Sequence, residues 1–151
     1  MGNTSVDEIL DFAIVQEQSS HDFYKHLGKS MDNAAMRDVF DNFAMQELGH
    51  KTKLEKMKRE GVVTLSPRED VPDLKIADYV VEVEPRPDMS YKDAIILAMK
   101  REKSAFKLYN DLAETVMDEG CRQLFLTLAQ EEANHKLRFE LEYDEHVMQE
   151  N

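Results

Sequence analysis

The sequence predicts an all-α fold, a four-helix bundle whose helices run up, down, down and up. Three observations support this prediction. Apolar residues recur at alternating spacings of three and four on both sides of the middle of the chain, as in helices that pack into a bundle. The chain also resembles itself at an offset of 85 residues, the separation of Glu47 and Glu132. All four prolines fall between Pro67 and Pro87, where a long helix is disfavoured.

The internal repeat aligns the two halves of the chain without a gap. The matched residues include Ala13 with Ala98, Glu17 with Glu102, Tyr24 with Tyr109, Phe40 with Phe125, Glu47 with Glu132, and His50 with His135. Two copies do not make a solenoid, so we interpret them as two helical hairpins. Because each hairpin needs the other to cover its apolar face, we expect a single domain over residues 1–151.

The first hairpin has recognisable helix ends. Ser5 and Glu8 form a capping box, which predicts that the first helix begins there. Gly28 is the expected end of this helix. A short connection follows, and Asp32 or Asn33 is the expected N-cap of the second helix. The short loop makes these two helices antiparallel neighbours.

Gly61 is the expected end of the second helix, and residues 62 to about 89 are expected to form a long crossover. Within it, Val80–Glu84 is expected to be extended. At roughly 3.3 Å per residue, this length easily recrosses a bundle about 40 Å long. The third helix therefore starts at the same end of the bundle as the second. We expect it to begin near Ser90, and the fourth helix between Asp118 and Gly120.

Four glutamates and two histidines lie on the apolar faces of these helices, near their middles: Glu17, Glu47, His50, Glu102, Glu132 and His135. Residues three apart share one helix face, so each Glu-x-x-His pair directs a carboxylate and an imidazole to one point. Buried carboxylates are costly unless paired, and clustered ones raise each other's pKa. Lys100, Arg101 and Lys103 flank Glu102 but are expected to point elsewhere. We therefore expect two bound cations, bridged by carboxylates, with one histidine on each.

Two tyrosines extend this pattern. Tyr24 and Tyr109 lie two helical turns beyond the glutamate of their own helix, on the same face. We expect their hydroxyls to orient ligand carboxylates across the bundle by hydrogen bonding; the alternative is a core aromatic whose hydroxyl is satisfied elsewhere. Glu131 is an alternative ligand to Glu132, but the register of the repeat selects Glu132.

The segments Phe43–His50 and Leu128–His135 resemble the ferritin-like superfamily, and most of all its rubrerythrin-type domain. The resemblance spans nearly the whole chain. It implies a ferritin-like bundle with a non-haem di-iron centre, two iron ions per chain, although manganese or zinc also suits such ligands. By position it implies the six residues above as ligands, with Glu47 and Glu132 as bridges. It further implies an oxidoreductase of peroxidase or ferroxidase type, which reacts with hydrogen peroxide or oxygen in oxidative stress or iron handling.

The chain departs from the related families at three positions. Ala105 stands where rubrerythrins proper carry a further carboxylate, so their redox-linked ligand exchange is not implied. The single Cys121 cannot build a four-cysteine rubredoxin-like iron centre, so electrons would come from a separate donor protein or from iron itself. Leu48 replaces the haem-ligating methionine of bacterioferritins, so haem is not implied.

Two other functions suit the same residues. One is iron binding or storage without turnover, although the long fifth helix of ferritins is not expected here. The other is a structural two-metal site, for example of zinc, that only holds the bundle together. The family likeness also implies a homodimer or a higher homo-oligomer.

Composition excludes several classes of partner. The formal net charge of −12 argues against binding to nucleic acid, which needs a basic surface. No apolar run approaches the roughly 20 residues of a membrane span. The amino-terminal residues lack the basic start and apolar core of a signal peptide. We therefore expect a cytoplasmic protein.

Overall fold

The computed structural model describes residues 6–64, 74–81, 86 and 88–147. Its four long helices are α1 (Val6–Lys29), α2 (Ala34–Glu60), α3 (Tyr91–Thr115) and α4 (Glu119–Glu142). A short 3₁₀ helix, η1 (Ile76–Tyr79), precedes α3, and a π-helical turn, η2 (Tyr143–Val147), follows α4. Within the described ranges, no helix is both long and apolar enough to cross a membrane.

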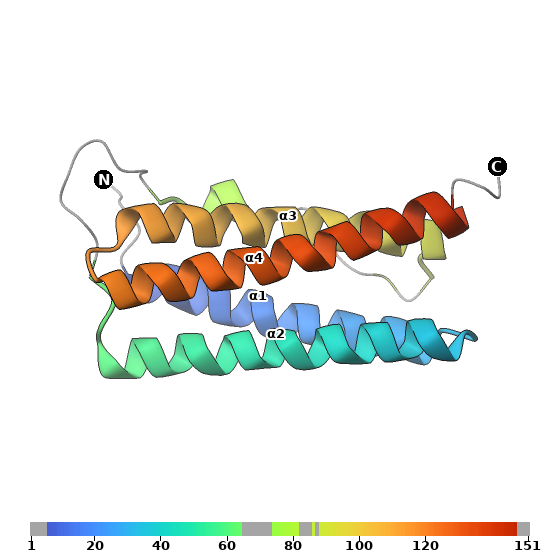
Figure 1. Ribbon diagram of the computed structural model, residues 1–151, viewed down its shortest axis with the longest axis horizontal. Helices are drawn as coiled ribbons and strands as arrows, with labels where there is room; N and C mark the ends of the chain where they lie inside the picture. Colours follow the sequence, from blue (N-terminus) through green and yellow to red (C-terminus); the bar gives the residue numbers. More distant parts are fainter. Residues whose placement is uncertain (1–5, 65–73, 82–85, 87, 148–151) are drawn as a thin grey trace.

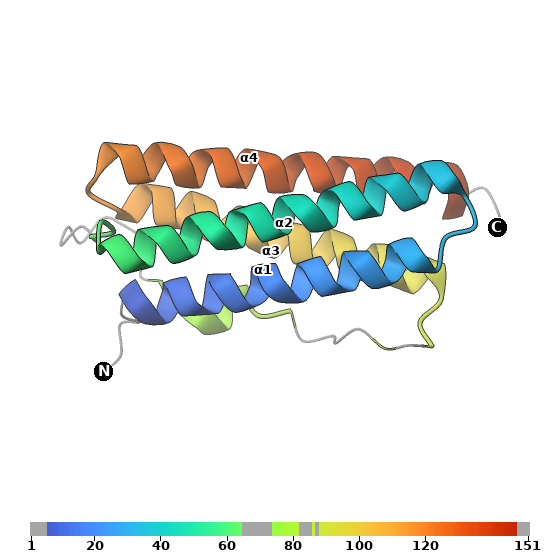
Figure 2. The same cartoon turned by 90° about the horizontal axis from the view of Figure 1, so that it is seen from below.

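The helices form a bundle of two antiparallel hairpins. Helix α1 pairs with α2, and α3 pairs with α4 (Figure 1). Helices α2 and α3 run in the same direction, which requires the connection between them to return along the length of the bundle (Figure 2). The predicted all-α, up-down-down-up fold is confirmed.

Most predicted helix ends are also confirmed. The side-chain oxygens of Asn33, Ser90 and Asp118 each accept a hydrogen bond from a backbone N–H in the first turn of the following helix. These bonds satisfy donors that would otherwise lack a partner. Gly61 ends α2 in the left-handed conformation, with φ of 64°, and its N–H donates to the carbonyls of Lys58 and Met57.

The prediction that Gly28 ends the first helix is wrong, because α1 continues through it to Lys29. Gly28 instead permits close packing against α2. A Cβ at this position would lie 3.0 Å from Asp41 Oδ1 and 3.5 Å from Phe40 Cβ. The absence of a side chain, rather than a break in the helix, explains this glycine.

Two other expected features lie partly or wholly outside the described residues. The predicted capping box is one of these features, because its first residue, Ser5, lies outside the described ranges. Of the segment expected to be extended, Val80 has an extended backbone, with φ of −78° and ψ of 130°, while residues 82–84 lie outside the described ranges. The preceding helix η1 packs against α3, and Ser104 Oγ donates a hydrogen bond to the carbonyl of Tyr79 at 2.5 Å.

The apolar core divides into two clusters, one toward each end of the bundle. The first includes Ile9, Leu10, Leu54, Leu112, Phe125 and Leu128. The second includes Phe23, Phe40, Phe43, Ile95 and Phe139. The glutamates and histidines at the middles of the helices lie between these clusters. The two clusters therefore separate this polar layer from solvent at the ends of the bundle.

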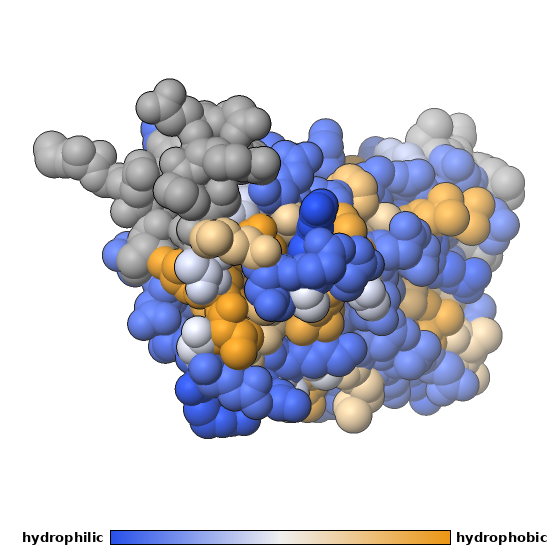
Figure 3. Space-filling model, turned by 60° about the vertical axis from the view of Figure 1, so that its left-hand side comes forward, coloured by the Kyte–Doolittle hydropathy of each residue, from blue (hydrophilic) through white to orange (hydrophobic). Residues whose placement is uncertain are grey.

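The outer surface has the opposite character. Most of the face in Figure 3 is hydrophilic, and apolar side chains appear on it as separated patches. Polar and charged side chains normally lie outside and are fully buried only when they have partners. The buried polar layer is therefore the feature of this fold that requires a chemical explanation.

Candidate metal centre

All six glutamates and histidines of the predicted centre are buried in the middle of the bundle. Their exposed fractions are 3% for Glu17, 1% for Glu47, His50, Glu102 and Glu132, and 2% for His135. Helices α1 and α3 each contribute one glutamate, and α2 and α4 each contribute a Glu-x-x-His pair. The two hairpins thus supply equivalent sets of side chains to one point.

The six residues form two overlapping groups that could each hold a metal ion. One group is Glu17, Glu47, His50 and Glu132, and the other is Glu47, Glu102, Glu132 and His135. Within each group, one ligand-type atom per residue lies within 4.8 Å of all the others. Because Glu47 and Glu132 belong to both groups, each offers a carboxylate that could bridge two ions. Shared carboxylates are typical of two-metal sites.

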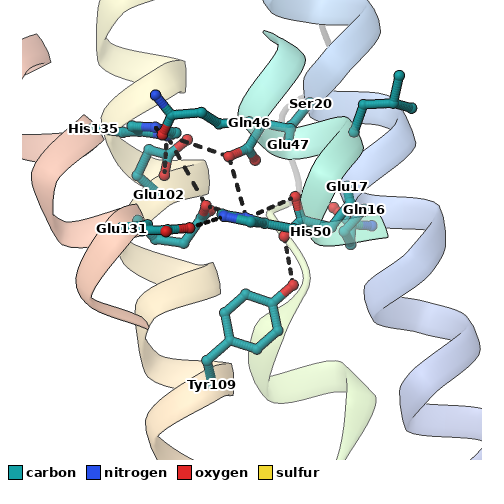
Figure 4. A network of polar contacts seen from close by, with 12 residues as sticks. Gln16, Glu17, Ser20, Gln46, Glu47, His50, Glu102, Tyr109, Glu131 and His135 are labelled. Carbon is teal, nitrogen blue, oxygen red and sulfur yellow. Dashed lines mark hydrogen bonds and ion pairs between the residues drawn. The ribbon is translucent and has the colours of Figure 1, made fainter. Parts of the chain in front are cut away.

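Both imidazoles direct Nδ1 toward the carboxylates (Figure 4). His50 Nδ1 lies 3.0 Å from Glu132 Oε1 and 3.5 Å from Glu17 Oε2. His135 Nδ1 lies 3.3 Å from Glu47 Oε1. One nitrogen of each ring therefore faces the interior of the cluster, and the other nitrogen faces outward.

Six buried side-chain atoms in the described part of the chain have no hydrogen-bond partner, and each comes from a different residue of this cluster. They are Glu17 Oε2, Glu47 Oε1, His50 Nδ1, Glu102 Oε2, Glu132 Oε1 and His135 Nδ1. A buried polar atom without a partner costs about 1–3 kcal/mol. Oxygen and imidazole nitrogen are good ligands for iron, manganese or zinc. The donor set therefore fits two metal ions, which would satisfy all six atoms at once.

Two tyrosines hold the outer oxygens of two carboxylates across the bundle. Tyr24 on α1 donates its hydroxyl proton to Glu102 Oε1 on α3. Tyr109 on α3 donates to Glu17 Oε1 on α1, at 2.5 Å. Each carboxylate consequently has one oxygen fixed by a tyrosine and the other directed into the cluster. The two hydroxyls contact ligand-type carboxylates across the bundle, as the sequence predicts. Their effect on metal binding remains a prediction.

The outward nitrogens of the histidines have partners that sequence reasoning missed. His50 Nε2 is hydrogen-bonded to the carboxylate of Glu131, and His135 Nε2 to Gln46 Oε1 at 2.8 Å. Glu131 thus lies outside both groups of four and contacts a histidine instead. A signal was present in the sequence, because Gln46 and Glu131 occupy equivalent positions of the 85-residue repeat, each directly before a glutamate of the cluster.

Burial and mutual repulsion make the shared carboxylates difficult to ionise. Burial raises the pKa of Glu47 and Glu132 well above the usual value for glutamate. The negative charges of Glu17 and Glu102 raise both pKa values further. Without a cation the cluster therefore holds protons, and metal binding would displace them.

The buried carboxylates also raise the pKa of His50, Tyr24 and Tyr109. Burial by itself lowers the pKa of His50, but the nearby carboxylates of Glu17 and Glu47 outweigh it and bring the pKa to about 9. Burial raises the pKa of Tyr24 and Tyr109 well above 10, and the carboxylates that they contact raise it further. The hydroxyls therefore remain protonated and act as donors.

Arg101 does point away from the carboxylates of the cluster, as expected, but it is buried rather than on the solvated surface. Arg101 is 8% exposed, and its Nη2 donates to Ser20 Oγ at 3.1 Å and to the carbonyl of Gln16 at 3.5 Å. The physical reason is that the buried face of a helix is wider than a single line of residues, so the residue before Glu102 also faces α1. A cavity of about 20 Å³ lies beside Arg101, Ser20 and Ala105 and reaches glutamates of the cluster. It has room for about one water-sized molecule.

The fold and the buried cluster define a ferritin-like four-helix protein with a carboxylate- and histidine-rich centre. The rubrerythrin family model matches residues 8–143, and the chain belongs to this family.

Comparison with solved structures supports the same fold. A protein from Thermotoga maritima, provisionally described as a ferritin-like diiron-carboxylate protein, has 21% sequence identity and a TM-score of 0.79; the alignment covers 97% of this chain and 99% of that one. A hypothetical protein from Pyrococcus furiosus has 28% identity and a TM-score of 0.74, with 95% and 91% of the two chains covered. No curated protein matches significantly.

Proposed function

We propose that this protein is a non-haem di-iron oxidoreductase that reduces hydrogen peroxide or oxygen, with Glu17, Glu47, His50, Glu102, Glu132 and His135 as its metal ligands. The observation that carries the proposal is the set of six buried atoms without a hydrogen bond, one from each of these residues, arranged in two groups that share two carboxylates. Membership of the rubrerythrin family supports peroxide or oxygen as the substrate.

Bound iron would supply the redox chemistry, and the protein supplies position, protons and exclusion of water. Tyr24 and Tyr109 each fix one oxygen of a carboxylate and leave the other free for a ligand position. Phe43 stacks on the ring of His135 with the ring centroids 4.0 Å apart, which limits rotation of that imidazole. These contacts prearrange the ligand atoms, so that little reorganisation accompanies metal binding.

The small cavity beside Ala105 supports a small substrate. Its volume of about 20 Å³ suits a molecule the size of water or peroxide rather than an organic substrate. Arg101 and Ser20 line it, together with Glu17 and Tyr109. We propose that peroxide or oxygen approaches the centre through this cavity.

Reduction of one peroxide to two waters consumes two electrons and two protons. The single Cys121 cannot build a four-cysteine iron centre. We therefore propose that a separate donor protein supplies the electrons.

Peroxide consumption by the iron-loaded protein tests this function. The reduced protein is loaded with two equivalents of Fe²⁺ without oxygen, desalted, and mixed with hydrogen peroxide. We expect it to consume peroxide faster than the same concentration of free Fe²⁺, and we expect Glu47→Gln to abolish the difference. Glu114→Gln, on the exposed face of α3, makes the same chemical change outside the cluster and should leave the rate unchanged.

Two results would overturn the proposal. One is a wild-type rate no higher than that of free Fe²⁺. The other is a centre that retains two zinc ions and shows no redox response when iron is supplied, which would indicate a structural site.

A further inference from the structure

The two halves of the metal centre differ at one pair of equivalent contacts. Gln46 and Glu131 occupy the same position of the 85-residue repeat, directly before Glu47 and Glu132. Each side chain reaches across the bundle to the outward nitrogen of the histidine on the other hairpin (Figure 4). One of these partners is a carboxylate and the other is a neutral amide.

The tyrosine contacts of the centre are closely symmetric. Tyr24 with Glu102 and Tyr109 with Glu17 form equivalent hydrogen bonds. The equivalent lysines Lys51 and Lys136 both donate to side chains outside the cluster, Gln18 on α1 and Glu140 on α4. The two histidines therefore differ in the charge of the side chain that is hydrogen-bonded to Nε2, and this difference acts directly on a ligand.

Arg101 is a second departure from symmetry, because its repeat partner is the neutral Gln16. Its guanidinium donates to Ser20 Oγ and to the Gln16 carbonyl rather than to the six ligand atoms. Because Arg101 is unchanged in any variant of residue 131 or 46, such variants isolate the effect of the histidine partners.

A carboxylate that is hydrogen-bonded to the outer nitrogen of a metal-binding imidazole strengthens the bond between that imidazole and the metal. It accepts the outer N–H of the ring, makes the inner nitrogen a stronger electron donor, and adds negative charge near the ion. An amide oxygen accepts the same N–H but adds no net charge. The side chain of Glu131 is 36% exposed, whereas the glutamates of the cluster are buried.

We propose that Glu131 makes the two metal positions unequal, so that the position at His50, with Glu17, Glu47 and Glu132, binds the first ion more tightly than the position at His135. Glu131 acts as a positioning residue through His50 and is not itself a ligand. This inference rests on the two-metal centre proposed above, but it does not depend on the reaction that the centre performs.

Titration with Co²⁺ without oxygen, followed by calorimetry and visible absorption, tests the inequality. The wild type should bind two Co²⁺ in two resolved steps. Glu131→Gln keeps the hydrogen bond but removes the charge, and should weaken the first step about 10-fold. Gln46→Glu should strengthen the second step by a similar factor. Glu114→Gln is the control for a change of one surface charge and should alter neither step.

The location of the first ion gives a second and independent measurement. Crystals grown with one equivalent of Co²⁺ should show the anomalous peak beside His50. In the double variant Glu131→Gln with Gln46→Glu, the peak should move to His135, because the carboxylate has been transferred. A merely structural role for Glu131 would not move the ion.

The outcomes separate this inference from the proposed function. If the wild type binds two Co²⁺ with indistinguishable affinity and the variants leave both steps unchanged, the inequality is refuted and the two-metal centre remains. A peak divided equally between the two positions has the same meaning. If the folded wild type binds no Co²⁺, the metal centre and this inference both fail.

Discussion

Replacement of Tyr109 by phenylalanine should destabilise the protein through a single lost hydrogen bond. The hydroxyl of Tyr109 is buried and donates to Glu17 Oε1 at 2.5 Å. Tyr109→Phe removes only this donor and keeps the ring that stacks on Phe125. The packing of the core is therefore preserved, and the variant reports on the polar contact itself.

The magnitude follows from the burial of both partners. A hydrogen bond to a charged group contributes about 1.5–3 kcal/mol, and here water cannot replace the lost donor. We expect the free energy of unfolding to fall by about 2 kcal/mol. For a chain of this length, that loss lowers the melting temperature by about 4–8 °C. Tyr24→Phe should have a similar effect, because its hydroxyl contacts Glu102 in the equivalent way.

Thermal and urea unfolding of the metal-loaded protein, followed by circular dichroism, measures this loss. Tyr91→Phe is the matched control, because its hydroxyl also donates to a carboxylate, Glu142 Oε1 at 2.6 Å, but at a half-buried position away from the metal centre. We expect the control to lose less than about 1 kcal/mol. Co²⁺ affinity should fall about 10-fold in Tyr109→Phe and remain unchanged in Tyr91→Phe.

A contradicting result is a Tyr109→Phe variant that is no less stable than Tyr91→Phe and binds Co²⁺ as tightly as the wild type. That result would mean that the hydroxyl neither stabilises the buried carboxylate nor positions it for a metal.

Three further predictions concern the pH dependence, a helix end and the buried arginine. In the metal-free protein, His50 has a pKa of about 9 against an ordinary value of 6.5, and the pKa values of Glu47 and Glu132 are also raised. The folded state therefore binds more protons than the unfolded chain, so the urea midpoint should fall as the pH rises from about 6 to 9, and saturation with metal should remove this slope. Asn33→Ala should lower the free energy of unfolding by about 1 kcal/mol in thermal unfolding, because it removes the N-cap of α2, and should leave the number of bound ions unchanged. Arg101→Met should cost about 1 kcal/mol in urea unfolding through its lost hydrogen bonds, again with two ions bound.

Local periodicity predicted the fold and the assembly of the cluster. A helix repeats its faces every three to four residues, so the spacing of apolar residues was enough to place Glu17 and Glu102 on buried faces. The 85-residue offset then related each Glu-x-x-His pair to the other. The fold brings these residues together as predicted, and their role as ligands remains a proposal.

Contacts between helices were harder to predict than faces of helices. The equivalence of Gln46 and Glu131 was visible in the sequence, but their bonds to His135 and His50 depend on how α2 packs against α4. Periodicity contains no information on that packing. For the same reason, Arg101 could not be placed against Ser20 on the neighbouring helix.

Some residues have more than one structural use, and the sequence does not distinguish between them. Gly28 suits the end of a helix, but here it permits α1 to lie close to Phe40 and Asp41 of α2. The four-residue helix η1 is too short to produce a periodic signal, and so Ile76–Tyr79 was not distinguished from the rest of the crossover.

The stoichiometry of iron binding tests the central claim most directly. Purified protein is reconstituted with Fe²⁺ without oxygen, desalted and analysed for metal and for protein concentration. The two-metal centre predicts two iron ions per chain in the wild type, and loss of at least one in the variant that replaces the shared carboxylates, Glu47→Gln with Glu132→Gln. A wild type that retains no iron, or a double variant that still retains two ions, would contradict the account.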